Sequence, residues 1–189
     1  MSATTGLDQL FAAGRWRVDR ANSVVGFRVK HLLFQTVIGR FRDFDGVIDL
    51  GETPSIVGSI RATSLETDRP ERDPHLRSPD FFDVERYPEL LFASREVDFG
   101  PDGTLVIAGD LTIKELTRPI ELAGVFRGLA AGSDGAERAA FDLRGELSRL
   151  DYGLTWNRML ETGGILVGDV VELALGVAAV RDVGVELAA

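Results

Sequence analysis

LVIAGDLTIK, residues 105–114, places its largest apolar side chains at every second position. One face of this segment carries Leu105, Ile107, Gly109, Leu111 and Ile113. A period of two residues is that of a β-strand, whereas an α-helix repeats every 3.6 residues. Because aspartate, threonine and lysine occupy the opposite face, the segment is predicted to be an antiparallel strand with one buried and one wet face.

Four other segments repeat this alternation. Their apolar faces are Val25, Phe27, Val29, His31 and Leu33; Ile120, Leu122, Gly124 and Phe126; Phe141, Leu143, Gly145 and Leu147; and Val171, Leu173, Leu175 and Val177. Further strands are expected near residues 15–19, 36–50, 54–63 and 90–99, the last with an ambiguous phase. Within 36–50 the apolar phase moves by one residue, which indicates a β-bulge or a sharp bend.

These segments amount to about eight or nine strands, and helix is scarce. The fold class is therefore predicted to be all-β, as a closed antiparallel up-and-down barrel, because closure leaves no sheet edge exposed. The inward glycines Gly109, Gly124 and Gly145 would let the strands coil tightly. Residues 129–140 are predicted to form a polar hairpin loop.

Two long connections interrupt the strand pattern. In residues 64–89, Asp73-Pro74 and Ser78-Pro79 each resemble an N-cap followed by proline, so two short helical turns are expected. The second connection, residues 150–166, contains Trp156 and Met159. Connections of this length in a compact domain are often lids or binding loops.

The composition excludes several functional classes. The chain has 189 residues, with 21 basic and 30 acidic side chains and a net charge of −9. This balance argues against nucleic-acid binding, which depends on Lys and Arg neutralising phosphates. The sequence has no cysteine and only two histidines, His31 and His75, so no disulfide, thiolate chemistry, metal site or cofactor is expected.

Targeting and membrane signals are not recognised. The first 16 residues lack a basic start and an apolar stretch of signal-peptide length, so a cytoplasmic location is expected. The most apolar region, from Gly163, is interrupted by Asp169 and Glu172, so no integral membrane segment is expected.

A set of motifs in fixed order carries a family resemblance. The motifs are W-x-V-D from Trp16, S-x-V-x-F-x-V-K-H from Ser23, G-x-F-x-x-F-x-G from Gly39, R-D-x-H-L from Arg72, D-F-F-D from Asp80, G-D-L-T-I from Gly109, R-L-D-Y-G from Arg149 and V-G-D-V from Val167. Together they resemble the YceI-like family of polyisoprenoid-binding, lipocalin-like barrels. The resemblance covers about residues 14–181. Residues 1–189 are therefore predicted to be one domain, with 1–13 flexible or forming a short helix.

This resemblance implies an elongated barrel that holds an isoprenoid or other long-chain amphiphilic lipid, with its tail inside and its head near one end. Such a protein would carry, store or sequester the lipid without catalysis. The ligand contacts implied by the resemblance and by the inward positions are Phe27, Val29, His31, Phe41, Phe81, Phe82, Phe92, Leu111, Phe126, Phe141, Arg149, Trp156, Met159 and Leu173.

Some of these residues have more than one interpretation. His31 could contact the ligand or be a hydrogen-bonded core histidine. Phe81 and Phe82 are expected to close one end of the barrel, and Trp156 and Met159 are candidates for a lid. Arg149 could pair with a carboxylate or approach an anionic head.

Three alternatives stay open at this point. The inward side chains fit a filled core as well as a hollow one, and a filled barrel would act through protein partners. An enzyme using His31 or His75 on a lipid-like substrate is a second possibility. An exposed barrel face could support a homodimer.

Arg28 and Lys30 fall mostly on outward positions, which favours a neutral or weakly polar lipid head.

Overall fold

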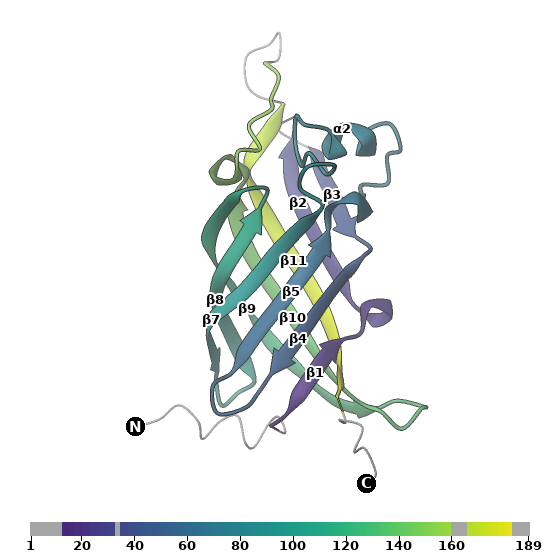
Figure 1. The fold of residues 1–189 in the computed structure, drawn as a ribbon, viewed down its shortest axis with the longest axis vertical. Helices are drawn as coiled ribbons and strands as arrows, with labels where there is room; N and C mark the ends of the chain where they lie inside the picture. The colour runs from purple at the N-terminus through teal and green to yellow at the C-terminus, as the bar shows by residue number, and fades with distance from the viewer. Residues whose placement is uncertain (1–12, 33–34, 160–165, 183–189) are drawn as a thin grey trace.

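The structure is a computed structural model that describes residues 13–32, 35–159 and 166–182. It consists almost entirely of antiparallel strands (Figure 1). The strands are β1 (Arg15–Val18), β2 (Val24–His31), β3 (Gln35–Phe41), β4 (Phe44–Asp49), β5 (Ser55–Arg61), β6 (Leu65–Glu66), β7 (Glu89–Phe99), β8 (Thr104–Ile113), β9 (Leu116–Ala131), β10 (Glu137–Ser148) and β11 (Val167–Arg181). Helical segments are α2 (Asp73–Arg77) and the 3-10 turns η2 (Arg20–Asn22), η3 (Ala62–Ser64) and η4 (Arg149–Tyr152).

The strands close into an antiparallel barrel of eight members. Three members are interrupted: β1 continues into β2, β3 into β4, and β5 into β6. The last strand, β11, pairs with β10 on one side and with both β1 and β2 on the other, which closes the sheet. The predicted fold class is confirmed.

The phase shift in residues 36–50 is a sharp bend. β3 ends at Phe41 and β4 begins at Phe44, and the two halves pair with different neighbours, β2 and β1. Phe41 and Phe44 are 7% and 6% exposed, so both side chains point inward although they are three positions apart. The bend therefore lets one chain segment contribute to two levels of the barrel.

The ambiguous phase of residues 90–99 also has a structural cause. The register of β7 against β8 shifts between Ser94 and Glu96, which makes Arg95 the extra residue of a bulge. The inward positions are even-numbered before the bulge, as at Phe92, and odd-numbered after it, as at Val97. A single alternating pattern cannot describe such a strand.

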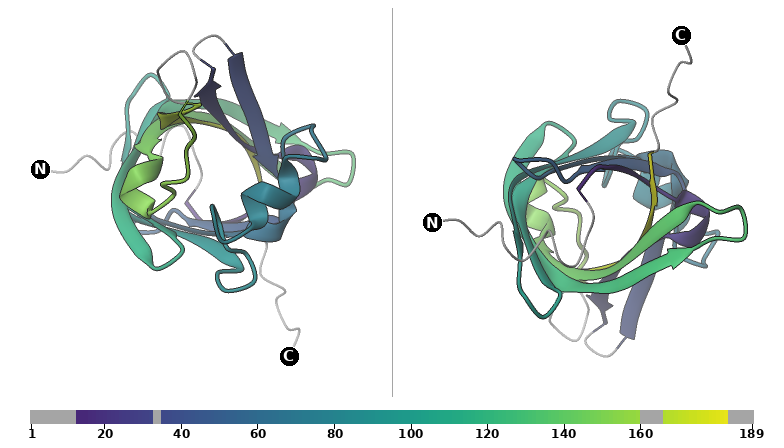
Figure 2. Two further views of the ribbon diagram at one scale, coloured as in Figure 1. Left: turned by 90° about the horizontal axis from the view of Figure 1, so that it is seen from above. Right: turned by 90° about the horizontal axis from the view of Figure 1, so that it is seen from below.

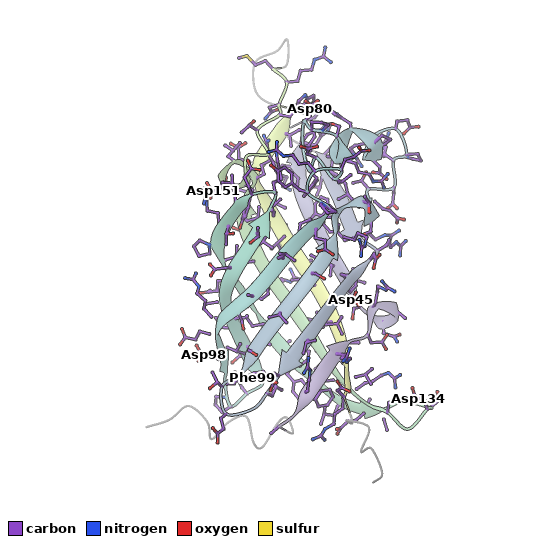
Figure 3. All side chains as sticks on the ribbon, in the orientation of Figure 1. Asp45, Asp80, Asp98, Phe99, Asp134 and Asp151 are labelled. Carbon is purple, nitrogen blue, oxygen red and sulfur yellow. The ribbon has the colours of Figure 1, made fainter. Side chains whose placement is uncertain are left out.

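The prediction of a hairpin loop over residues 129–140 is wrong. β9 extends to Ala131 and β10 begins at Glu137, so only residues 132–136 form the turn. Alanines at both strand ends conceal the alternation in the sequence. The turn projects from the lower end of the barrel, where Asp134 is labelled in Figure 3, and Arg138 holds Asp134 with two hydrogen bonds of 2.8 Å.

The inward glycines allow close approach of neighbouring strands, as the sequence predicts. A Cβ atom added at Gly124 would lie 1.8 Å from the backbone oxygen of Asp142. One added at Gly145 would lie 2.7 Å from the backbone oxygen of Glu121. Any side chain at these two positions would force β9 and β10 apart.

The connection between β6 and β7 contains one helix rather than two. Asp73 begins α2, but its carboxylate does not cap the helix, because it accepts hydrogen bonds from the backbone N–H and the hydroxyl of Thr67, at 3.1 and 2.5 Å. Ser78 begins only a turn, in which its carbonyl accepts hydrogen bonds from the N–H groups of Phe81 and Asp83. The second predicted helical turn is therefore wrong.

Two packed clusters occupy the two ends of the interior. The lower cluster surrounds Trp16, which is fully buried, and the upper cluster surrounds Leu65 and Tyr152. Phe99, labelled near the lower end in Figure 3, packs against the first of these.

Part of the sequence prediction lies outside the described residues. This holds for residues 1–12, for Leu33 and for residues 163–165 of the apolar segment that begins at Gly163, whose remainder forms β11. Within the described ranges, no helix has the length and apolar character needed to cross a membrane.

Candidate ligand-binding cavity

A cavity of about 610 Å³ lies inside the barrel. This volume falls in the range of roughly 300–1,000 Å³ that is usual for small-molecule sites. All eight barrel strands contribute lining residues, and most of these side chains are apolar. The alternation of each strand explains this composition, because the residues on one face of every strand point to the barrel axis. The barrel is therefore hollow above a packed lower end.

The lower limit of the cavity is apolar. Leu105, Phe141 and Val177 line it, and Trp16 lies beneath them in the lower cluster. The ring of Phe126 packs against Phe141 with 5.4 Å between ring centroids. Among the described residues, the buried charged side chains are Asp73 and Arg149, both near the upper end, so the lower end suits the terminus of an apolar chain.

An aromatic cluster, formed by His75, Phe81 and Trp156, marks the upper end. The ring centroids of His75 and Trp156 are 4.6 Å apart, and those of Phe81 and Trp156 are 5.4 Å apart. His75 belongs to α2, and Trp156 belongs to the connection that follows η4. These segments start from opposite sides of the barrel's upper end (Figure 2), so the aromatic contacts join them across the cavity.

His75 also contacts a carboxylate at this end. Its Nε2 atom lies 2.9 Å from a carboxylate oxygen of Asp80, and both side chains are partly exposed. The hydroxyl of Ser78 donates to the backbone oxygen of His75, at 2.7 Å. The His75–Asp80 pair therefore fixes the ring that contacts Trp156.

Arg149 is the most deeply buried charged side chain on the cavity wall, at 4% exposure. It donates hydrogen bonds to the backbone oxygens of Leu154, Trp156, Val167 and Gly168, and to the carboxylate of Asp169 at 3.1 Å. Burial lowers the pKa of the Arg149 guanidinium, while Asp169 opposes this change. Arg149 therefore holds the connection that carries Trp156 against the start of β11.

Charged residues of both signs line the upper rim. Lys30, Arg69, Glu71 and Arg72 all border the cavity. Arg72 donates to the hydroxyl and the backbone oxygen of Thr67, at 2.8 and 2.9 Å, and burial lowers its pKa. Lys30 is exposed and has the outward phase of β2, as predicted, although at the end of the strand it also borders the cavity.

Twelve of the fourteen residues predicted to contact a ligand line the cavity. They are Phe27, Val29, His31, Phe41, Phe81, Phe82, Phe92, Leu111, Phe141, Arg149, Trp156 and Leu173. Phe126 does not line it, because its ring packs beside Phe141 at the lower end. Met159 is 82% exposed and does not line the cavity, and its place in a lid stays a prediction.

The structure places His31, Arg149 and Phe81, whose roles the sequence leaves open. His31 is half-buried and lines the cavity. Arg149 pairs with a carboxylate, as one of its two interpretations required. Phe81 belongs to the aromatic cluster at the upper end, in agreement with the prediction that it helps to close one end of the barrel.

Sequence reasoning missed the lining residues that strand alternation does not govern. Arg69, Glu71 and Arg72 lie in a connection without periodic pattern, and Phe44 follows the bend between β3 and β4. The signals that pointed to this region were the length of the connection 64–89 and its motifs R-D-x-H-L and D-F-F-D. Among the described residues, no group of three or more histidine, aspartate or glutamate side chains could hold a metal ion.

Comparisons with known proteins agree with this geometry. The family model for the YceI-like domain matches residues 16–179. Protein YceI of Escherichia coli O157:H7 is 33% identical over 156 residues, which cover 77% of this chain and 81% of that protein.

Two solved structures are also similar. The YCEI protein of Campylobacter jejuni has a TM-score of 0.69 at 30% identity, covering 87% of this chain and 96% of that one. A polyisoprenoid binding domain from Saccharophagus degradans has a TM-score of 0.69 at 14% identity, covering 88% of this chain and 98% of that one. At this identity the second similarity concerns the fold.

Proposed function

Because this chain belongs to the YceI-like domain family, we propose that it binds a long-chain isoprenoid or a similar amphiphilic lipid inside the barrel. Binding would serve carriage, storage or sequestration of the lipid. The observation that supports the proposal most strongly is the apolar cavity of about 610 Å³. The polyisoprenoid binding domain of Saccharophagus degradans has the same fold, which adds support.

The size of the cavity suits a chain rather than a compact ligand. It holds on the order of 20 methylene-sized groups, if each takes the ~30 Å³ that a water molecule has in the liquid. Each buried CH₂ group contributes about 0.8 kcal/mol, against association costs of roughly 4–15 kcal/mol. A tail that fills the cavity therefore binds through apolar burial alone.

The two ends of the cavity differ, which orients the ligand. The lower end is apolar, and the upper rim carries Lys30, Arg69, Glu71 and Arg72. A tail would point down and a polar head would lie at the rim. Because the rim combines both signs of charge, a neutral or weakly polar head, such as a quinone or an amide, fits it.

The proposal includes no chemical step. His75 is engaged with Asp80 and Trp156, and the nearby Ser78 hydroxyl is engaged with a backbone oxygen. A variant in which His31 and His75 are both alanine is expected to keep its bound lipid. Turnover of a lipid substrate by the natural protein, lost in that variant, would favour the enzyme alternative.

Titration with cis-parinaric acid, a fluorescent fatty acid, tests the site directly. Val29 lines the cavity, whereas its neighbour Arg28 is exposed on the opposite face of β2. Val29→Trp fills part of the cavity and is expected to weaken binding about tenfold or more. Arg28→Trp adds the same side chain outside and should leave binding unchanged. Equal affinities for the two variants would place the ligand elsewhere.

Two further expectations belong to this proposal. A cytoplasmic location is tested by fractionating the cells that produce the protein. A homodimer is tested by light scattering of the purified protein across a range of concentrations.

A further inference from the structure

The ring of Phe27 covers Gly39 on the cavity wall. The two residues are directly opposite each other in the pairing of β2 with β3. A Cβ atom added at Gly39 would lie 2.2, 2.6 and 2.8 Å from the Cζ, Cε1 and Cε2 atoms of Phe27. Phe27 lines the cavity, but Gly39 does not, because the ring lies between it and the open space.

We propose that Gly39 sets the width of the cavity by letting the Phe27 ring lie flat against β3, and that this width determines which lipid tails the barrel accepts. This inference rests on the proposed function and concerns the width available to the tail, because a methyl-branched prenyl chain is wider than a straight acyl chain. Gly39 acts through Phe27 and is a positioning residue.

Gly39 differs from Gly109, Gly124 and Gly145 in what surrounds it. Added Cβ atoms at Gly109, Gly124 and Gly145 would each meet a backbone oxygen at 2.7 Å or less. At Gly39 the three nearest atoms all belong to the far end of the Phe27 ring, which can rotate. Gly39 is also not among the residues with a left-handed φ, so alanine can adopt its backbone conformation.

The consequence of a methyl group at position 39 follows from the neighbours of Phe27. The new methyl group would occupy the space on the cavity wall where the Phe27 ring lies. Beside it lies the ring of Phe41, at 5.9 Å between centroids, which in turn contacts Phe82 at 6.0 Å. The remaining open space is the cavity. Gly39→Ala is therefore expected to turn the Phe27 ring into the cavity and narrow it.

The test compares two alcohols with the same head and the same number of carbon atoms. Farnesol has a methyl-branched prenyl tail, and 1-pentadecanol has a straight one. Fluorescence of Trp156, which lines the cavity, reports binding in a titration. Gly39→Ala is expected to weaken farnesol binding about tenfold or more, and 1-pentadecanol binding much less.

Two further variants separate this role from a general structural one. Gly176→Ala is the matched control, because its added Cβ would meet only a carboxylate oxygen of Asp142 at 3.9 Å, outside the cavity. It should change neither affinity. Gly39→Ala combined with Phe27→Leu should restore farnesol binding, because leucine is shorter than phenylalanine and clears the new methyl group.

A crystal structure of Gly39→Ala provides the readout that does not need a ligand. The Phe27 ring is expected to project into the cavity. If the ring stays on the wall and β3 moves instead, or if both alcohols weaken equally, the inference is wrong. If the natural protein binds neither alcohol, the proposed function fails, and the position of the ring still decides whether Gly39 sets the width.

Discussion

Replacement of Arg149 by alanine should destabilise the protein more than any exposed arginine change. The side chain is 4% exposed and serves four backbone oxygens and one carboxylate. Alanine would leave these acceptors without their donor. It would also release the connection carrying Trp156 from the start of β11.

These contacts determine how much unfolding free energy Arg149→Ala loses. Asp169 is 44% exposed, so water can solvate its carboxylate once Arg149 is removed, and the loss comes mainly from the buried backbone oxygens, at about 1–3 kcal/mol for each one left without a partner. All these contacts come from one guanidinium group near the upper rim, where water can hydrogen-bond to some of the oxygens that lose Arg149. We therefore expect a decrease of about 3–5 kcal/mol in the free energy of unfolding, which is the cost of two or three such oxygens.

Urea unfolding followed by tryptophan fluorescence measures this change. With a slope of about 1–3 kcal/mol per molar urea, the midpoint should fall by roughly 1–5 M. Arg127→Ala is the matched control, because Arg127 is 62% exposed and pairs with Asp142 alone. That variant should lose less than about 1 kcal/mol. If the two variants lose the same amount, Arg149 does not hold the connection as described.

Three other changes have defined outcomes. Leu111→Asp puts a charge on the cavity wall and should abolish folding or lipid retention, whereas Val106→Asp on the outer face of the same strand should be tolerated in both assays. Burial raises the pKa of the Tyr152 hydroxyl from 10.0 to about 12, so the protonated form is favoured in the fold. Stability should therefore be intact below pH 10 and fall by about 2–3 kcal/mol as the pH rises to 12, and Tyr152→Phe should flatten that loss in pH-dependent unfolding. Asp73→Ala removes the acceptor of two Thr67 hydrogen bonds and should cost about 1–3 kcal/mol by thermal melting; an unchanged melting temperature would contradict this role.

Strand alternation predicted much of this fold, because it depends only on which face of a strand meets the barrel axis. Leu105, Ile107, Leu111 and Ile113 are buried as their spacing requires. The same reasoning failed where the chain changes phase. The bulge at Arg95 and the small residues before the turn at 132–136 conceal the period, so local sequence does not define the strands there.

The candidate site was predictable in part for the same reason. Inward strand positions such as Phe27 and Leu173 line the cavity. Met159 does not, because no periodic rule fixes the direction of a side chain in a long connection. Arg69 was not predicted for the same reason, because its position at the rim follows from the path of the connection and not from a repeating sequence pattern.

Whether the interior is hollow could not follow from the sequence. An inward phenylalanine can fill the barrel axis or lie on the wall, and the alternating pattern is the same in both cases. The contact between Phe27 and Gly39 depends on the register of β2 with β3. Register is a property of the folded sheet, so only the structure reveals this contact.

Native mass spectrometry of the purified protein, with a solvent extract of the same sample, tests the central claim most directly. A lipid in the barrel predicts an additional mass, in a ratio of one ligand to one chain, that appears in the extract as a long-chain lipid. Val29→Trp should lose that mass, and Arg28→Trp should keep it. A bare polypeptide mass that stays unchanged after incubation with prenyl and fatty lipids would contradict the account.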